Sequence, residues 1–325
     1  MTDPTTETAP QDTSWLGLIK ATGEAFAEDG CPRMAAALSY FTAFSLGPML
    51  VLVIMIAGLV FGQGAIEGTL TEQLTGALGE QGAEQVTTML SRVKERSATG
   101  GNVGATLLSL VGLLFGATGA FGELQTSINR IWRVAPDPDR GGIKGFVAKR
   151  LLSFSMIVVI ALLLLTLLAS SAILATFGEV LTPYLPGSVA APLWMGVDVL
   201  VSLVLALGLF TTIFRVLPDA RVPWRDVMIG AAVTTALFAL GKTGLSVYLG
   251  RSSVASAFGA AGSLALVLVW VYYSAMILLL GAQFTRAWVA RQGRVIEPSP
   301  GAVRIVESRT LVRPGDNDTT PSTPT

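Results

Sequence analysis

The stretch from Leu151 to Leu174 reads LLSFSMIVVIALLLLTLLASSAIL and contains no charged residue over its 24 positions. A transmembrane helix needs about 20 mostly apolar residues, because the hydrocarbon core of a bilayer is about 30 Å thick and a helix rises about 1.5 Å per residue. This stretch therefore predicts a helix that crosses a membrane.

Five further segments are long and apolar enough for the same interpretation. The first apolar run begins after residue 30 and is too long for the hydrophobic region of a cleavable signal peptide. We predict an all-α, polytopic membrane protein whose membrane domain covers residues 15–295. Its six predicted transmembrane helices are approximately 35–61, 103–121, 151–177, 192–214, 227–249 and 263–289.

The composition excludes several kinds of active site. Histidine is absent, which excludes Ser-His-Asp triads, Cys-His pairs and His-rich zinc sites. Cys31 is the only cysteine, so an internal disulfide, a Cys₄ zinc site and a CxxC pair are excluded as well. The sequence also lacks a phosphate-cradling loop and paired catalytic carboxylates. We therefore expect a protein that is not an enzyme and that has no catalytic residues, metal or cofactor.

The basic residues predict the orientation of the chain. Six spans place both termini on one side, together with the 122–150 and 215–226 loops. This side carries 17 of the 22 Lys and Arg residues, the opposite side carries four, and Lys242 lies within a span. Because cytoplasmic loops carry the excess of Lys and Arg, both termini are predicted to be cytoplasmic. The formal net charge is zero, so no bulk field attracts nucleic acid.

The segments outside the spans differ in character. Residues 1–14 and 296–325 are rich in Pro, Thr and other polar residues and are predicted to be disordered tails. The 62–102 loop predicts two short helices that form either a static cap or a lid. Residues 15–29 predict a short amphipathic helix that lies at the membrane interface or packs on cytoplasmic loops. Its apolar face would contain Trp15, Leu18, Ile19, Thr22 and Phe26.

Polar residues within the spans are the candidate site residues. Ser45 and Pro48 predict a kink in the first span, which either lines a cavity or serves packing. Asp198 and Lys242 lie at similar depth in the outer half of the membrane, where charges are costly. They either form an ion pair or reach the outer interface separately. Arg251 either meets an anionic head group or is an ordinary interfacial arginine.

Two further groups of residues are expected at the ends and faces of helices. Glu123, Gln283 and Arg286 lie near the inner helix ends and could form one polar network. Trp132, between Arg130 and Arg133, is typical of an interfacial anchor. The second span contains a GxxxG motif that predicts close helix packing and allows a homo-oligomer through glycine-rich faces. Its two glycines are Gly112 and Gly116.

Several motifs, in this order and spacing, resemble one known family. They are Ala35–Phe41 with Ser45 and Pro48, Ile128–Trp132, Phe214–Asp219 with Val222–Asp226, Gly230 with Gly241, Lys242 and Tyr248, Phe258–Gly259, Trp270–Tyr273 and Leu280–Phe284. Over residues 15–295 the chain resembles the YihY/virulence factor BrkB family of bacterial inner-membrane proteins. The resemblance implies a six-helix bundle in the bacterial plasma membrane. Gln283 departs from the family, which often has Glu at this position.

The resemblance also implies a role at the cell envelope. Some members have carried the label ribonuclease BN, but a zinc-dependent ribonuclease needs a His/Asp cluster and this chain has no histidine. We expect a protein that binds or translocates an amphipathic, lipid-like envelope molecule. Its partners would be membrane lipids and not nucleic acid. The alternative is a structural or assembly protein for envelope integrity that transports nothing.

Overall fold

A computed structural model describes the chain in several ranges. They are residues 14–45, 91, 103–138, 187–251 and 262–306, together with the single helical positions 151, 155, 158, 159, 162 and 166. Most of the predicted 62–102 loop and most of the third span lie outside the described residues. The same holds for residues 1–13 and 307–325 and for Pro48.

The described part of the chain is mostly helical, as the sequence predicts. Its helices are α1 (Trp15–Glu28), a helix over residues 31–45, α4 (Val103–Ile131), α6 (Gly187–Val216), α7 (Trp224–Arg251) and α9 (Gly262–Arg291). Four predicted spans fall inside α4, α6, α7 and α9. Among the described residues, two helices are long and apolar enough to cross a membrane. They are Pro192–Val216 and Val267–Arg291, with mean hydropathies of 2.3 and 1.8.

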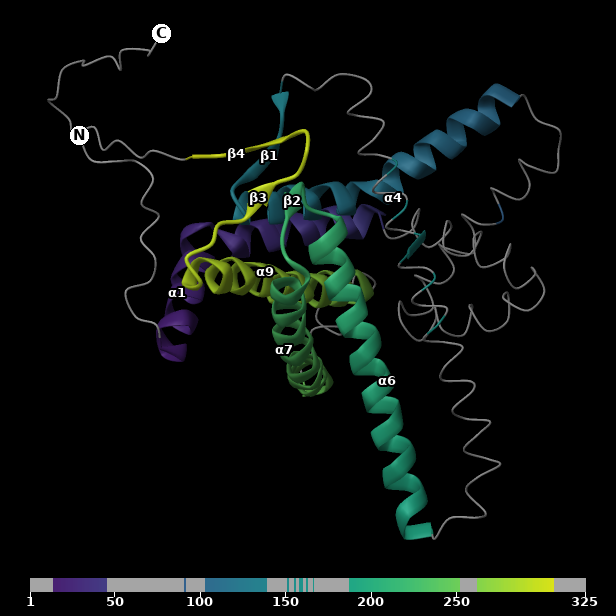
Figure 1. Cartoon of the computed structure of the whole chain (residues 1–325). Coiled ribbons are helices and arrows are strands. Elements are labelled where there is room, and N and C mark those ends of the chain that lie inside the picture. The colour runs from purple at the N-terminus through teal and green to yellow at the C-terminus, as the bar shows by residue number, and fades with distance from the viewer. Residues whose placement is uncertain are drawn as a thin grey trace, which may run out of the picture.

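α1 packs against α9 through part of its apolar face (Figure 1). The hydroxyl of Ser14 begins the helix by accepting a hydrogen bond from the Gly17 amide at 3.0 Å. Leu18 and Thr22 are buried. Trp15 and Ile19, which the sequence places on the same face, remain exposed. The helix therefore contributes to the core and also presents apolar side chains at the surface.

The core forms where the C-terminal halves of α4, α6 and α9 meet the N-terminal half of α7. Its largest fully buried side chains include Ile128, Ile131, Phe214, Leu217, Val227 and Leu279. The N-terminal half of α6 extends away from this core (Figure 1) and exposes Leu193, Val199 and Leu200. Burial is therefore concentrated at one end of α6, and its other end presents aliphatic side chains outward.

The beginning of the C-terminal segment is ordered, and this corrects the expectation of a free tail from residue 296. Strands β3 (Glu297–Pro298) and β4 (Ala302–Arg304) pair antiparallel with β2 (Ala220–Arg221) and β1 (Val134–Pro136), respectively (Figure 1). Ile296 adds a buried side chain. The sequence does not reveal these strands for two reasons. Each is only two or three residues long in a Pro-rich segment, and each pairs with a strand that is distant in the chain.

α7 and α9 approach closely through two reciprocal Gly–Thr contacts. A Cβ atom at Gly230 would lie 1.9 Å from Thr285 Oγ1, and one at Gly281 would lie 1.9 Å from Thr234 Oγ1. Each threonine hydroxyl donates to the carbonyl four residues back in its own helix, at 2.7 Å and 2.8 Å. Small residues thus set this helix–helix distance. Gly112, which the sequence suggested for packing, has nothing within 4 Å of its Cβ position.

We expect Gly230→Ala and Gly281→Ala each to destabilise the protein, because the added methyl group must displace α7 from α9. Overpacking of this kind costs about 1–3 kcal/mol. Thermal unfolding of the detergent-purified protein measures the effect. The matched control is Gly208→Ala in α6, where a Cβ meets nothing within 4 Å. Equal unfolding temperatures for all three variants and the wild type would show that this contact does not set the helix distance.

Candidate functional site

The carboxylate of Asp29, at the end of α1, joins three separate parts of the chain. Its side chain is only 4% exposed, and Arg133 Nη2 lies 2.6 Å from Oδ1. Gln283 Nε2 donates to Oδ2 at 2.6 Å, and Arg286 Nη1 lies 3.3 Å from the same oxygen. The structure therefore brings the predicted residues Gln283 and Arg286 together on an acceptor that the sequence analysis did not identify.

Glu123, the third residue expected in this network, lies half-buried on α4. Within the described ranges it makes no hydrogen bond or ion pair with Gln283 or Arg286. Asp29 and Arg133 take part instead. The signal in the sequence that could have indicated Asp29 is its position directly before a glycine, between two apolar segments. In the structure this glycine, Gly30, has a φ of 69° in the turn between two helices.

Cys31 lies beside this cluster and is fully buried. Burial is the main reason why the pKa of its thiol is raised to about 11. The hydrogen bond from Gln283 lowers this pKa by a smaller amount, and the negative charge of Asp29 raises it. The thiol is therefore protonated at neutral pH. A buried thiol of this kind packs as a small apolar group and does not act as a nucleophile.

A second buried carboxylate, that of Asp226 in the first turn of α7, anchors the segment after α9. Arg294 donates to both oxygens at 2.7 Å and 2.9 Å, and Trp288 Nε1 donates at 3.2 Å. Burial alone would raise the pKa of Asp226, but the hydrogen bonds and charge of Arg294, with help from Trp288 and Gln292, hold it below its usual value. Asp226 is therefore ionised at neutral pH.

A third connection explains two of the motifs in the sequence. Asn129 Nδ2 donates to Asp219 Oδ2 at 2.7 Å, and the Asp219 amide donates back to Asn129 Oδ1 at 2.8 Å. This reciprocal pair ties α4 to the turn after α6.

Trp132, expected at the interface, is instead buried, and its Nε1 donates to the Ala282 carbonyl at 3.1 Å. A buried indole needs such an acceptor.

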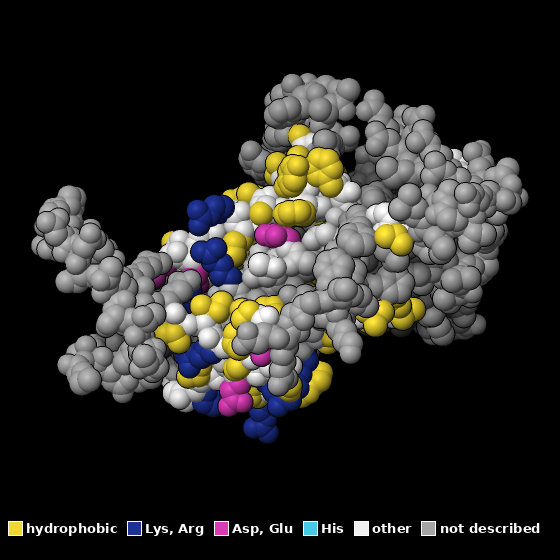
Figure 2. All heavy atoms as spheres, turned by 90° about the horizontal axis from the view of Figure 1, so that it is seen from above, with side chains coloured by type: hydrophobic (Ala, Val, Ile, Leu, Met, Phe, Trp, Pro, Cys, Tyr) yellow, Lys and Arg dark blue, Asp and Glu magenta, His cyan; other side chains and the backbone are white. Residues whose placement is uncertain are grey.

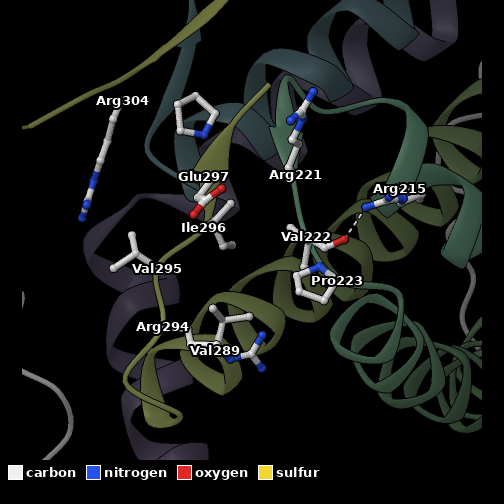
Figure 3. A pocket seen from close by; sticks show the side chains of 11 residues that line it. Arg215, Arg221, Val222, Pro223, Val289, Arg294, Val295, Ile296, Glu297 and Arg304 are labelled. Carbon is white, nitrogen blue, oxygen red and sulfur yellow. Dashed lines mark hydrogen bonds between the residues drawn. The ribbon is translucent and has the colours of Figure 1, made fainter. Parts of the chain in front are cut away.

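A pocket of about 990 Å³ opens between the end of α6, β2 and the segment that follows α9 (Figure 3). Four arginines and one glutamate supply its charge, and six apolar side chains supply the remainder of its lining. The lining residues are Arg215, Arg221, Arg294, Arg304, Glu297, Val222, Pro223, Val289, Val295, Ile296 and Pro298. The pocket is therefore both cationic and aliphatic. Figure 2 views the molecule from the end with the strands and shows the same mixture of basic and hydrophobic side chains.

The arginines of the pocket are held in different ways. Arg294 is neutralised by Asp226. Arg215 donates to the Val222 carbonyl and lies over the ring of Trp224, with Cζ 5.2 Å from its centroid. These contacts orient its guanidinium, and no carboxylate of the described residues pairs with it. In the part of the chain that the structure describes, Arg221 makes no hydrogen bond or ion pair through its side chain.

The residues predicted within the membrane are only partly described. Ser45 is buried, and its hydroxyl accepts from the Ala120 amide of α4 at 3.3 Å. Asp198 lies on α6, and Lys242 and Arg251 lie on α7. The side chains of these three residues are outside the described part, as are Pro48 and the surroundings of Gly116, so the ion pair stays a prediction. The described residues contain no group of three Cys, Asp or Glu that could hold a metal ion.

We expect Asp29→Asn to destabilise the protein, because it leaves Arg133 and Arg286 without a counter-charge. Breaking a buried ion pair from one side costs about 3 kcal/mol. Thermal unfolding in detergent measures this cost. The matched control is Glu28→Gln, which removes the same charge from an exposed neighbouring residue. If both variants unfold at the same temperature as the wild type, the Asp29 carboxylate does not stabilise the contact between these segments.

The Arg294–Asp226 pair predicts a specific pH dependence. The pKa of Asp226 is lower in the folded state, so its contribution is complete above the ordinary pKa of 3.8 and is lost as pH falls below it. Arg294→Ala should therefore unfold at a lower temperature than the wild type near neutral pH, and this difference should shrink in acid. The control is Arg225→Ala, an exposed neighbour of Asp226. A difference that does not change with pH would contradict the role of the Asp226 charge.

Comparison with known proteins places the chain in a family. A model of the virulence factor BrkB family matches residues 22–304. The UPF0761 membrane protein of Alcanivorax borkumensis is 28% identical over 269 residues, which cover 82% of this chain and 59% of the relative. The UPF0761 membrane protein of Methylibium petroleiphilum is 30% identical over 276 residues, 82% of this chain and 61% of the relative.

A UPF0761 membrane protein of Pseudomonas aeruginosa is 27% identical over 299 residues, 87% of this chain and 67% of the relative. The chain thus spans about three fifths of the length of the first two relatives. No solved structure matches the chain significantly. The family match over most of the chain, the apolar helices and the names of the relatives agree. The chain belongs to the virulence factor BrkB family and is a membrane protein.

Proposed function

We propose that this membrane protein binds or translocates an amphipathic, lipid-like molecule of the bacterial envelope and performs no covalent chemistry. The observation that carries the proposal is the lining of the pocket between α6, β2 and the segment after α9. It combines guanidinium groups with the side chains of Val222, Val289 and Ile296 (Figure 3). A ligand that satisfies both kinds of lining has a charged end and an apolar end.

The proposal includes a topology of six spans in the plasma membrane with both termini cytoplasmic. The distribution of charge supports this topology, because the side predicted to be cytoplasmic carries 17 of the 22 basic residues. The structure supports it too. Arg133, Arg215 and Arg294 come from three different predicted cytoplasmic segments, and all contribute to the clusters or to the pocket at the packed end.

A structural or assembly role is the second candidate, and the exposed half of α6 favours it. Leu193, Val199 and Leu200 face outward there. Such a surface is satisfied by lipid chains or by an apolar partner helix, including a second copy of the chain. A protein that acts only as a scaffold needs no ligand in the pocket. The two candidates therefore differ in whether the purified protein carries and moves an amphiphile.

We expect the protein, purified in mild detergent, to retain a native amphiphile that mass spectrometry detects. After reconstitution into vesicles, it should transfer a labelled phospholipid between leaflets faster than protein-free vesicles do. Lys242→Ala should slow this transfer, because a charge within a span is costly and is typical of a functional pathway. Lys20→Ala, on the exposed surface of α1, is the control. Transfer at the rate of empty vesicles together with no retained amphiphile would favour the scaffold.

A further inference from the structure

We propose that the pocket binds the phosphate group of an anionic phospholipid headgroup and that Arg221 is its direct contact. This inference rests on the proposed function and names the class of its ligand. The occupant would enter with its phosphate toward the arginines and its glycerol and first methylene groups against the aliphatic wall. Small-molecule sites commonly measure about 300–1,000 Å³. A pocket of about 990 Å³ therefore has room for a headgroup.

The charge of the lining favours an anion. Four arginines and one glutamate, Glu297, line the pocket, and the carboxylate of Asp226 pairs with Arg294. Arg221 and Glu297 are register partners in the β2–β3 pair, yet no ion pair joins them. Within the described residues the Arg221 guanidinium is therefore available to a ligand. Figure 3 shows Arg221 and Arg304 on either side of β3, with Arg215 farther along the wall.

The chemistry of the contact favours phosphate. A guanidinium group is planar, stays charged and offers two parallel N–H donors, which match the oxygens of a phosphate. Arg215 adds a fixed charge, because the Val222 carbonyl and the ring of Trp224 hold its guanidinium in place. A carboxylate could use the same donors, so an acidic peptide is included in the binding test to separate the two ligands.

The position of the pocket favours a lipid over a free anion or an acidic peptide. It lies at the C-terminal ends of α6 and α9, the two described helices that are long and apolar enough to cross a membrane. Trp224 is 59% exposed beside it, and exposed tryptophan is typical of the headgroup level of a bilayer. Basic pockets between helices on the cytoplasmic side are suited to anionic headgroups.

Arg294 has a different role from Arg221. Its bidentate bond to Asp226 holds the segment from Val295 to Pro298, which forms one wall of the pocket. It is a positioning residue. Replacing Arg294 should lower both the stability of the fold and ligand binding, whereas replacing Arg221, which is exposed on a two-residue strand, should lower binding alone.

The test measures binding of three soluble probes to the full-length protein in detergent. They are short-chain phosphatidylglycerol, short-chain diacylglycerol and inorganic phosphate, and tryptophan fluorescence reports binding. We expect phosphatidylglycerol to bind more tightly than either other probe and to weaken as ionic strength rises. Arg221→Ala should weaken its binding about tenfold, the loss expected for one charge-assisted contact. Arg221→Lys should bind with intermediate affinity.

The control is Arg225→Ala, which removes the same charge four residues along the chain and outside the pocket. It should bind phosphatidylglycerol like the wild type, and thermal unfolding should show that Arg221→Ala is folded. Unchanged affinity in Arg221→Ala overturns this inference but leaves the proposed function standing. Wild-type protein that binds no amphiphile overturns both.

Three other outcomes would overturn the assignment of the ligand. Inorganic phosphate that binds as tightly as phosphatidylglycerol would overturn the lipid assignment in favour of a free anion. A polyglutamate peptide serves as an additional probe. If it binds more tightly than phosphatidylglycerol and loses affinity in Arg221→Ala, it overturns the lipid assignment in favour of a protein partner. Diacylglycerol that binds as tightly as phosphatidylglycerol would exclude a role for the phosphate.

Discussion

The buried carboxylate of Asp29 is the interaction on which the packed end of the molecule depends. Burying a charge is costly unless oppositely charged and hydrogen-bonding groups surround it, and here Arg133, Arg286 and Gln283 do so. These partners come from α9 and the end of α4, whereas Asp29 ends α1. The charge can therefore be buried only when all three segments are in place, which makes their assembly cooperative.

The same principle extends to the segment after α9, through Asp226 and Arg294. The pocket exists because residues 294–304 fold back and pair with strands from two distant parts of the chain. β4 adds to β1 next to Arg133, whose left-handed backbone, with a φ of 56°, redirects the chain after α4. The Asp29 cluster thus fixes the strand that receives the C-terminal segment, and the structural clusters and the pocket form one connected unit.

The sequence predicts the helices well because each depends on local composition and length. α6 and α9 were recognisable from their apolar residues alone. The polar contacts of Asp29, Asp226 and Asp219 were not, because each joins residues 62 to 257 positions apart. Gln283 and Arg286 were predicted without their acceptor. Trp132 was expected at the interface, since a single sequence does not show that the Ala282 carbonyl lies beside it. The paired strands at 297–304 were missed for the same reason.

The basic residues from which the orientation is predicted also build the packed end of the molecule, and these two roles constrain each other. A charge count treats Arg133, Arg286 and Arg294 as equivalent signals for topology. In the structure Arg294 pairs with Asp226, whereas Arg133 and Arg286 share Asp29, so two buried carboxylates offset most of their charge. Among the described residues, Arg215 and Arg221 have no carboxylate partner of this kind. Both of these line the pocket. Two positive charges without an internal carboxylate therefore lie at the pocket, where an anionic headgroup would bind.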